Sequence, residues 1–203
     1  MRARTLRTGP RILCAAAFLA LSQVVLAASP AAAPSRPAAS GPDGRDAAAA
    51  LTRLFARSCF RHAGDTRGLR AALAGPSYRA ASDAATARLL ARPGRAYSVE
   101  GEPGHLVVLS FDDGWCGDGG TGIDPHALTM RLSAAVHAQG ASMRLMAAGD
   151  DGHEQRYLLT PPAPAAPVVL LVLLQPAGPL MQASLFAAPL PPGAMPSKPE
   201  RPR

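Results

Sequence analysis

The sequence predicts an α+β domain in which N-terminal helices and one crossing helix pack on a mostly antiparallel sheet of five or six strands. Three observations support this fold class. Apolar residues recur at helical spacing from residue 51 to about residue 92. From Ala96 onward the chain changes to short β-type runs separated by turn residues. A single helical pattern, opened by Asp124 and ended by Gly140, interrupts those runs. Helices and antiparallel strands segregated in this way are typical of α+β folds.

The helical part of the sequence divides into three predicted helices. In the first, apolar and small side chains recur on one face while arginines lie on another. The second is expected over residues 66–74, where Thr66 can cap its start. The third runs from Ser82 or Asp83 to about Arg92, before a Pro-Gly pair. The first helix carries Leu51, Leu54, Phe55, Ser58 and His62 on one face and Arg53, Arg57 and Arg61 on the other.

The strand-like part contains one run that is aliphatic throughout, residues 168–174. Seven residues are too few to cross a bilayer, which needs about 20 in a helix, so this run is predicted to be a buried strand. Residues 112–123 are rich in Gly and Asp and predict a loop, and residues 149–152 predict a hairpin turn. Strands are expected over residues 96–100, 105–111, 142–147, 154–160, 168–174 and 180–187.

The N-terminus predicts a secretory signal peptide over residues 1–27. Four arginines precede an apolar run over residues 12–26, and the small residues Ala27 and Ala28 follow it. A membrane anchor is the alternative, but the run is shorter than the roughly 20 apolar residues that span a bilayer. We therefore expect export to the periplasm or the medium, with no transmembrane span after cleavage.

Two segments of low apolar content flank the predicted domain. Residues 28–46 form an Ala/Pro-rich leader and residues 189–203 a Pro-rich tail, and neither has enough apolar surface to offset the entropy of ordering. A single domain is thus expected over residues 47–188. The formal net charge of the whole chain is +7, but four of its basic residues lie in the signal peptide. Because nucleic-acid binding needs a basic patch on the folded domain, we expect none.

After signal cleavage two cysteines remain, Cys59 and Cys116. In an exported protein an even pair predicts a disulfide. The alternative is a small thiol-dependent hydrolase with Cys116 as its nucleophile. A thiol enzyme needs a histidine to accept the proton, and His126 and His137 fall on the polar face of the crossing helix. Acidic residues around Cys116, among them Asp118, would raise the pKa of a thiol. No catalytic residue is assigned.

The residues 112–124 suggest a calcium site or a phosphate-binding loop, and neither pattern is complete. The carboxylates lack the alternate spacing and the late Glu of a calcium loop. The glycines of residues 117–122 lack both the Lys of a P-loop and the spacing of a dinucleotide-binding turn. The five histidines show no paired ligand spacing. We therefore expect neither metal nor cofactor, and we interpret the arginine stripe as a solvated face, with contact to anionic lipid or polysaccharide as the alternative. The four carboxylates are Asp112, Asp113, Asp118 and Asp124.

The segment Phe55-Ala-Arg-Ser-Cys59, followed by Gly64-Asp65 and by Leu69-Arg-Ala-Ala-Leu73, resembles small exported proteins of proteobacteria whose function is uncharacterised. The resemblance covers about residues 50–116 and includes the second cysteine, which follows a central strand. It implies an envelope location and a paired cysteine, and it implies no activity.

These observations lead to three functional hypotheses. The first is a non-catalytic periplasmic or secreted protein with a binding, inhibitory or envelope-accessory role. The second is the thiol hydrolase. The third is a subunit of an envelope complex, in which aliphatic strands and Met143, Met146 and Met181 leave an apolar edge for a protein partner.

Overall fold

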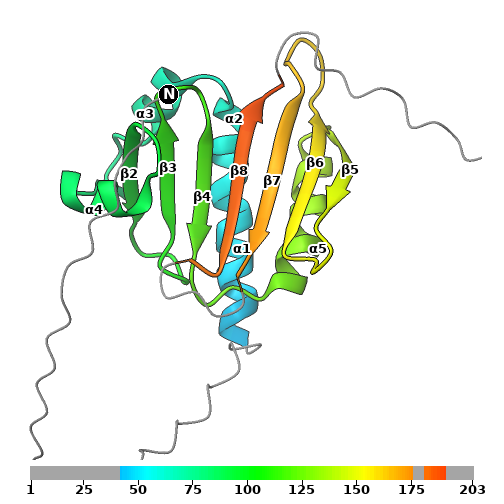
Figure 1. Cartoon of the computed structure of the whole chain (residues 1–203), viewed down its shortest axis with the longest axis horizontal. Coiled ribbons are helices and arrows are strands. Elements are labelled where there is room, and N and C mark those ends of the chain that lie inside the picture. The colour runs from blue at the N-terminus through cyan, green and yellow to red at the C-terminus, as the bar shows by residue number, and fades with distance from the viewer. Residues whose placement is uncertain (1–41, 176–180, 191–203) are drawn as a thin grey trace, which may run out of the picture. The chain divides into compact units, whose positions relative to one another are not determined.

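A computed structural model describes residues 42–175 and 181–190 of the chain (Figure 1). The fold is α+β, as the sequence predicts: helices pack on one antiparallel sheet, and one disulfide joins the two layers. The sheet has eight strands, so the expected five or six is too low. The signal peptide, most of the leader and most of the tail lie outside the described residues.

The first long helix starts earlier than the apolar pattern predicts. Helix α1 begins at Pro42, so residues 42–46, assigned above to the leader, are helical. The alanines that follow look like low-complexity sequence, but alanine is the best helix former, and Ala47, Ala48 and Ala50 are fully buried. The helices are α1 (Pro42–Arg57), α2 (Cys59–His62), α3 (Thr66–Ala72), α4 (Asp83–Leu89) and α5 (Pro125–Ala138).

Short side chains fix the starts of the later helices. The Asp124 carboxylate accepts from the backbone N–H groups of His126 and Ala127, both at 3.0 Å, so it caps α5 as predicted. At α3 the cap is Asp65, which accepts from Gly68 at 2.8 Å, whereas Thr66 was expected in that role. A carboxylate accepts such bonds more strongly than a hydroxyl.

The last strand of the chain lies in the middle of the sheet. The spatial order is β1-β2-β3-β4-β8-β7-β6-β5, and all neighbours are antiparallel. Strand β8 therefore joins an N-terminal half, β1 to β4, to a C-terminal hairpin unit, β5 to β7. The strands are β1 (Tyr78–Ala80), β2 (Gly94–Val99), β3 (Val107–Phe111), β4 (Cys116–Gly120), β5 (Ser142–Ala148), β6 (Glu154–Thr160), β7 (Val168–Leu174) and β8 (Ala183–Pro189).

Strand β4 occupies the segment that we expected to be a loop. Its sequence, Cys-Gly-Asp-Gly-Gly, has no apolar alternation, yet every residue in it is buried. The glycines provide clearance for side chains of the neighbouring strand and turn. A Cβ at Gly117 would lie 2.6 Å from the Phe186 ring, and one at Gly119 would lie 2.5 Å from the sulfur of Met181. Packing against β3 and β8, rather than local propensity, makes this segment a strand.

The main core lies between the sheet and the helices α1 and α5. In Figure 1 both helices run behind the sheet, with α1 behind β4 and β8. We call this side of the sheet the inner face. Full burial of a leucine side chain contributes about 1.5–3 kcal/mol, and this layer contains many of them. Its largest fully buried side chains include Leu51, Leu54, Phe55, Leu128, Leu132, Leu159, Leu170 and Leu185.

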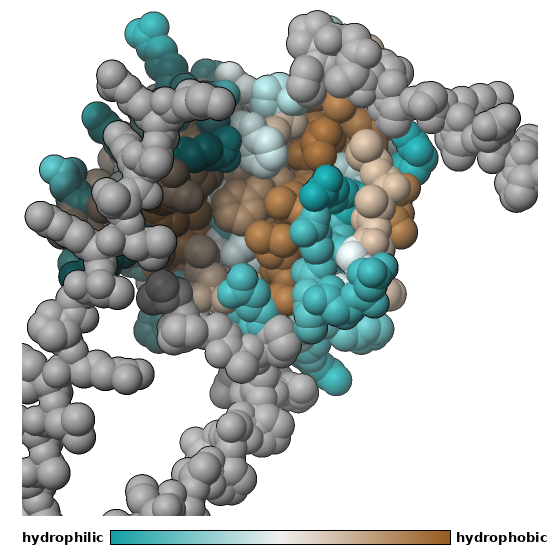
Figure 2. Space-filling model, in the orientation of Figure 1, coloured by the Kyte–Doolittle hydropathy of each residue, from teal (hydrophilic) through white to brown (hydrophobic). Residues whose placement is uncertain are grey.

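Among the described residues, only one end of the opposite, outer face of the sheet is covered by a helix. There Leu89 and Leu90, at the end of α4, pack over a small cluster on β2 and β3. Figure 2 looks onto this face and shows hydrophobic residues gathered over β7 and β8, with hydrophilic residues beside them over β6. The register places Val169, Leu171 and Phe186 there, and all three are half-buried. No helix among the described residues has both the length and the apolar character needed to span a membrane.

Candidate functional site

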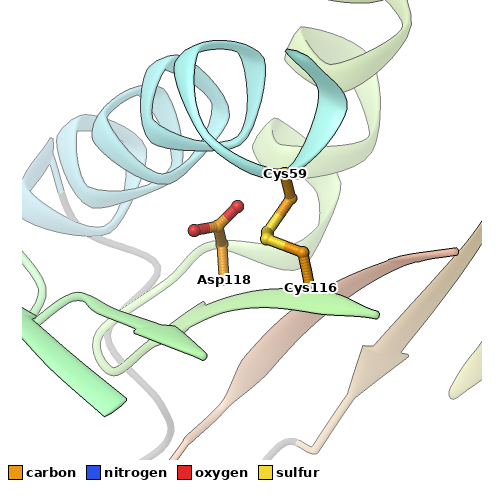
Figure 3. Close-up of side chains that lie close together, drawn as sticks. All are labelled: Cys59, Cys116 and Asp118. Carbon is orange, nitrogen blue, oxygen red and sulfur yellow. A yellow bond between two sulfur atoms is a disulfide. The ribbon is translucent and has the colours of Figure 1, made fainter. Parts of the chain in front are cut away.

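The predicted disulfide is present and fully buried. Cys59 is the first residue of α2 and Cys116 is the first residue of β4, and their Cα atoms lie 5.2 Å apart (Figure 3). Their exposed fractions are 0% and 1%. The bond therefore fastens the helical layer to the centre of the sheet, and its second cysteine sits in a strand, not in the expected loop.

A buried carboxyl group lies beside the disulfide. Asp118 follows Cys116 by two residues on β4, so both side chains point to the inner face, as Figure 3 shows. The Asp118 carboxyl oxygens accept from the Ser58 hydroxyl at 3.0 and 2.8 Å, and the backbone N–H of Cys59 donates to the same group. The residue is 1% exposed.

These donors are available because the first predicted helix is broken. The apolar pattern suggests one continuous helix to His62, but α1 ends at Arg57 and α2 begins at Cys59. Ser58, between them, has φ −107° and ψ −91°, which is not helical. A helix that starts leaves N–H groups without partners in its first turn. Asp118 supplies one of the missing acceptors, so the carboxyl group closes the helix break from the sheet side.

Burial raises the pKa of Asp118 from 3.8 to about 7. The hydrogen bonds from Ser58 and Cys59 and the charge of Arg57 act in the opposite direction and are smaller. The contacts also accommodate a protonated carboxyl. Ser58 has a single hydroxyl proton, and its oxygen lies 2.6 Å from the Leu54 carbonyl oxygen. When Asp118 is protonated, its O–H donates to Ser58 and Ser58 donates to Leu54.

The two sulfurs and the Asp118 carboxyl lie within 4.8 Å of one another, which is the spacing of metal ligands. Cysteine binds metals as a thiolate, and both sulfurs here are in a disulfide. The arrangement is therefore a covalent crosslink with an adjacent acid, and we assign no metal to it.

The remaining carboxylates of the expected loop face different partners. Asp112 pairs with Arg70, and Asp113 pairs with Arg92 at 2.6 Å. The guanidinium of Arg92 also lies 4.8 Å from the centre of the Trp115 ring. These contacts order the turn between β3 and β4 and hold the acids apart, so the four carboxylates do not converge on a common point.

The histidines considered for a thiol enzyme are not brought into a site with Cys116. His126 and His137 are exposed on α5, and His62 is half-buried in α2. None of the three cavities that we describe within residues 42–175 and 181–190 is lined by Cys116.

Sequence reasoning missed the Ser58–Asp118 contact. Ser58 was assigned to the apolar stripe of a continuous helix, and Asp118 to an acidic loop. One signal was available: in a strand, residues i and i+2 share a face, so an acid two residues after a buried cysteine is itself buried. That signal depends on recognising β4, whose composition hides it.

Comparison of the chain with protein-family models, with curated proteins and with solved structures finds no match.

Proposed function

We propose that the chain is an exported, non-catalytic binding protein that acts in the periplasm or outside the cell. The observation that carries this proposal is the buried Cys59–Cys116 disulfide. Disulfides persist in oxidising compartments and are rare in the cytosol. The same bond occupies Cys116, the candidate nucleophile. The basic and apolar pattern of residues 1–27 supports export independently.

The thiol-hydrolase alternative has little physical support. Cys116 would need to be reduced and then ionised within the core. Cys116 is 1% exposed and lies beside a carboxyl group. Reactive cysteines sit instead in partly exposed, electropositive surroundings.

A second candidate function, a subunit of an envelope complex, is favoured by the outer face of the sheet. Apolar side chains on β7 and β8 remain half-exposed there (Figure 2). Of the methionines expected to form an apolar edge, Met146 is 39% exposed on the edge strand β5, while Met143 and Met181 are half-buried. Large exposed apolar patches are uncommon on monomers and often mark interaction sites.

A count of free thiols tests the leading proposal. The full chain is produced with its N-terminus intact, purified from the periplasm, unfolded without reductant and alkylated, and its intact mass is measured. We expect a chain that begins at Ala28 and carries no alkyl group, and two alkyl groups when reductant is added first. A chain that keeps residues 1–27 would carry one alkyl group on Cys14. Two alkylated cysteines without reductant would overturn the proposal.

Light scattering on the same purified protein separates the two candidate functions. A stable monomer that stays soluble argues against an obligate complex of this chain with itself. A larger assembly, or co-purification of a second envelope protein at a fixed ratio, favours the subunit role.

A further inference from the structure

An open cleft lies beside the break between α1 and α2, on the helical side of the sheet. One wall comes from the end of α1 and from α2. The facing wall comes from the segment 161–168, between β6 and β7, together with Pro189 at the end of β8. The volume is about 530 Å³. Sites for small molecules are typically about 300–1,000 Å³, so the cleft has room for a ligand of moderate size.

The charged side chains that line the cleft are all positive. Arg53, Arg57 and Arg61 line it, and no acidic side chain does. The three follow one another at intervals of four residues, and all three line the cleft although the helix breaks between Arg57 and Arg61. Arg53 and Arg57 share Glu102, at 3.1 and 3.6 Å, whereas no acidic side chain of the described residues is paired with Arg61. Glu102 supplies one negative charge, and Asp118, which interacts with Arg57, has a pKa of about 7, so the three guanidinium groups leave the cleft with a net positive charge.

Apart from the arginines, the only polar side chain that lines the cleft is Gln139, and the rest of the lining is apolar. Phe60 is partly buried against the main core and contributes an aromatic surface on the helical wall. The facing wall consists of proline, alanine and valine side chains, and the prolines add surface without an N–H donor. The apolar lining residues are Ala56, Phe60, Ala63, Pro161, Ala165, Ala166, Pro167, Val168 and Pro189.

We propose that this cleft binds an amphipathic anion: a single apolar chain lies against Phe60 and the prolines, and a carboxylate or phosphate head binds Arg57 and Arg61. Arginine suits this role because its planar guanidinium binds such head groups through two parallel hydrogen bonds. The proposal gives a ligand class to the binding role and rests on it. The ligand proposal and the proposed function fail in different experiments, because a negative binding result leaves the number of free thiols in the purified protein unchanged.

Two properties of the cleft set the preferred ligand. The arginines require a negative head, so an uncharged analogue of the same length binds more weakly. The apolar walls require a chain, so inorganic phosphate does not bind measurably. Burying one methylene is worth enough to tighten binding by up to about fourfold. We therefore expect affinity to rise with each added methylene until the chain fills the cleft.

The test uses the mature protein, residues 28–203, and titration calorimetry with sodium dodecanoate below its micelle concentration. The comparison ligands are octanoate, dodecanol, dodecyl phosphate and inorganic phosphate. We expect saturable binding of one dodecanoate per chain, comparable binding of dodecyl phosphate, and weaker binding of octanoate and dodecanol. Vesicles of phosphatidylcholine and phosphatidylglycerol form a separate arm, which distinguishes a free amphiphile from a bilayer surface.

Three variants locate the site. Arg61→Gln removes a charge-assisted hydrogen bond and is expected to weaken dodecanoate binding roughly tenfold or more. Ala165→Trp places a bulky ring at an exposed position of the facing wall and should abolish binding without disturbing the core. Arg88→Gln changes an exposed arginine on α4, outside the cleft, and is the matched control that leaves the affinity unchanged.

The proposal is overturned if dodecanoate does not bind, or if Arg61→Gln and Arg88→Gln bind it equally well. Binding to vesicles alone, without binding of monomeric dodecanoate, would also overturn it and would indicate a surface contact with anionic membranes. Circular dichroism of each variant confirms that a loss of binding is not a loss of fold.

Discussion

Replacing the buried Asp118 by asparagine should change how the stability of this protein depends on pH. The substitution keeps the size and one acceptor oxygen of the side chain, and its amide can donate to the Ser58 hydroxyl. What it removes is the titration of a carboxyl group that is 1% exposed and lies beside the disulfide. The variant thus isolates the electrostatic cost of ionising this group inside the core.

The sign follows from the raised pKa of Asp118, which is about 7 in the folded chain against 3.8 for the unperturbed group. Below pH 4 the carboxyl is protonated in both states. Between pH 4 and pH 7 the unfolded chain loses the proton while the folded chain keeps it, so the free energy of unfolding falls as pH rises. Each pH unit lowers the free energy of unfolding by up to about 1.4 kcal/mol, so the loss from pH 4 to pH 7 is roughly 4 kcal/mol. Above pH 7 the carboxyl is ionised in both states, and the contribution of Asp118 to the free energy of unfolding no longer changes with pH.

The assay is urea unfolding of wild type and Asp118→Asn at a series of pH values from 4 to 8, with the disulfide intact. The difference in unfolding free energy between the two proteins should grow by roughly 4 kcal/mol in favour of the variant as pH rises from 4 to 7. Asp150→Asn, in the exposed turn between β5 and β6, is the control and should show no such trend. A difference that stays constant across this range would refute a raised pKa for Asp118.

Three further sets of substitutions test the disulfide, the core and a close backbone approach. Cys59→Ala and Cys116→Ala should each lower the free energy of unfolding by roughly 4 kcal/mol in denaturant titrations. The double variant should be little less stable than either single variant. Additive losses would mean that the two cysteines are not bonded to each other. Leu170→Ala, at a fully buried position of β7, should cost about 2–5 kcal/mol, whereas the 52% exposed Leu145→Ala should cost less than about 0.5 kcal/mol. Gly94→Ala should lower the melting temperature, because its Cβ would lie 2.5 Å from a backbone oxygen of β3; an unchanged melting temperature would contradict that packing.

The parts of the fold that the sequence predicts correctly are those with local causes. Asp124 caps α5 because a short carboxylate side chain reaches the N–H groups of its own helix. Strand β7 was recognised because Val168–Leu174 is aliphatic throughout, as a strand buried in a sheet requires. The disulfide was predicted from compartment and cysteine number, neither of which needs coordinates.

The parts that were missed depend on neighbours distant in the sequence. Strand β4 pairs with β8, and Gly117 lies opposite Phe186 across that pair. Nothing near residue 117 indicates which strand will lie beside it, so the glycines suggested a loop. The other strand missing from the sequence prediction is β1, which is only three residues long and forms by pairing with β2.

The sequence alone thus determined the fold class, the Asp124 cap of α5 and the cysteine pair, because these follow from spacing and residue chemistry along the chain. Only the tertiary structure decided that the helix breaks at Ser58, that Asp118 is buried beneath the break, and that three exposed arginines face an apolar wall across a cleft. The physical reason is that burial and the pKa of an acid are set by whichever segments pack around it, and those contacts are chosen by the free energy of the whole core.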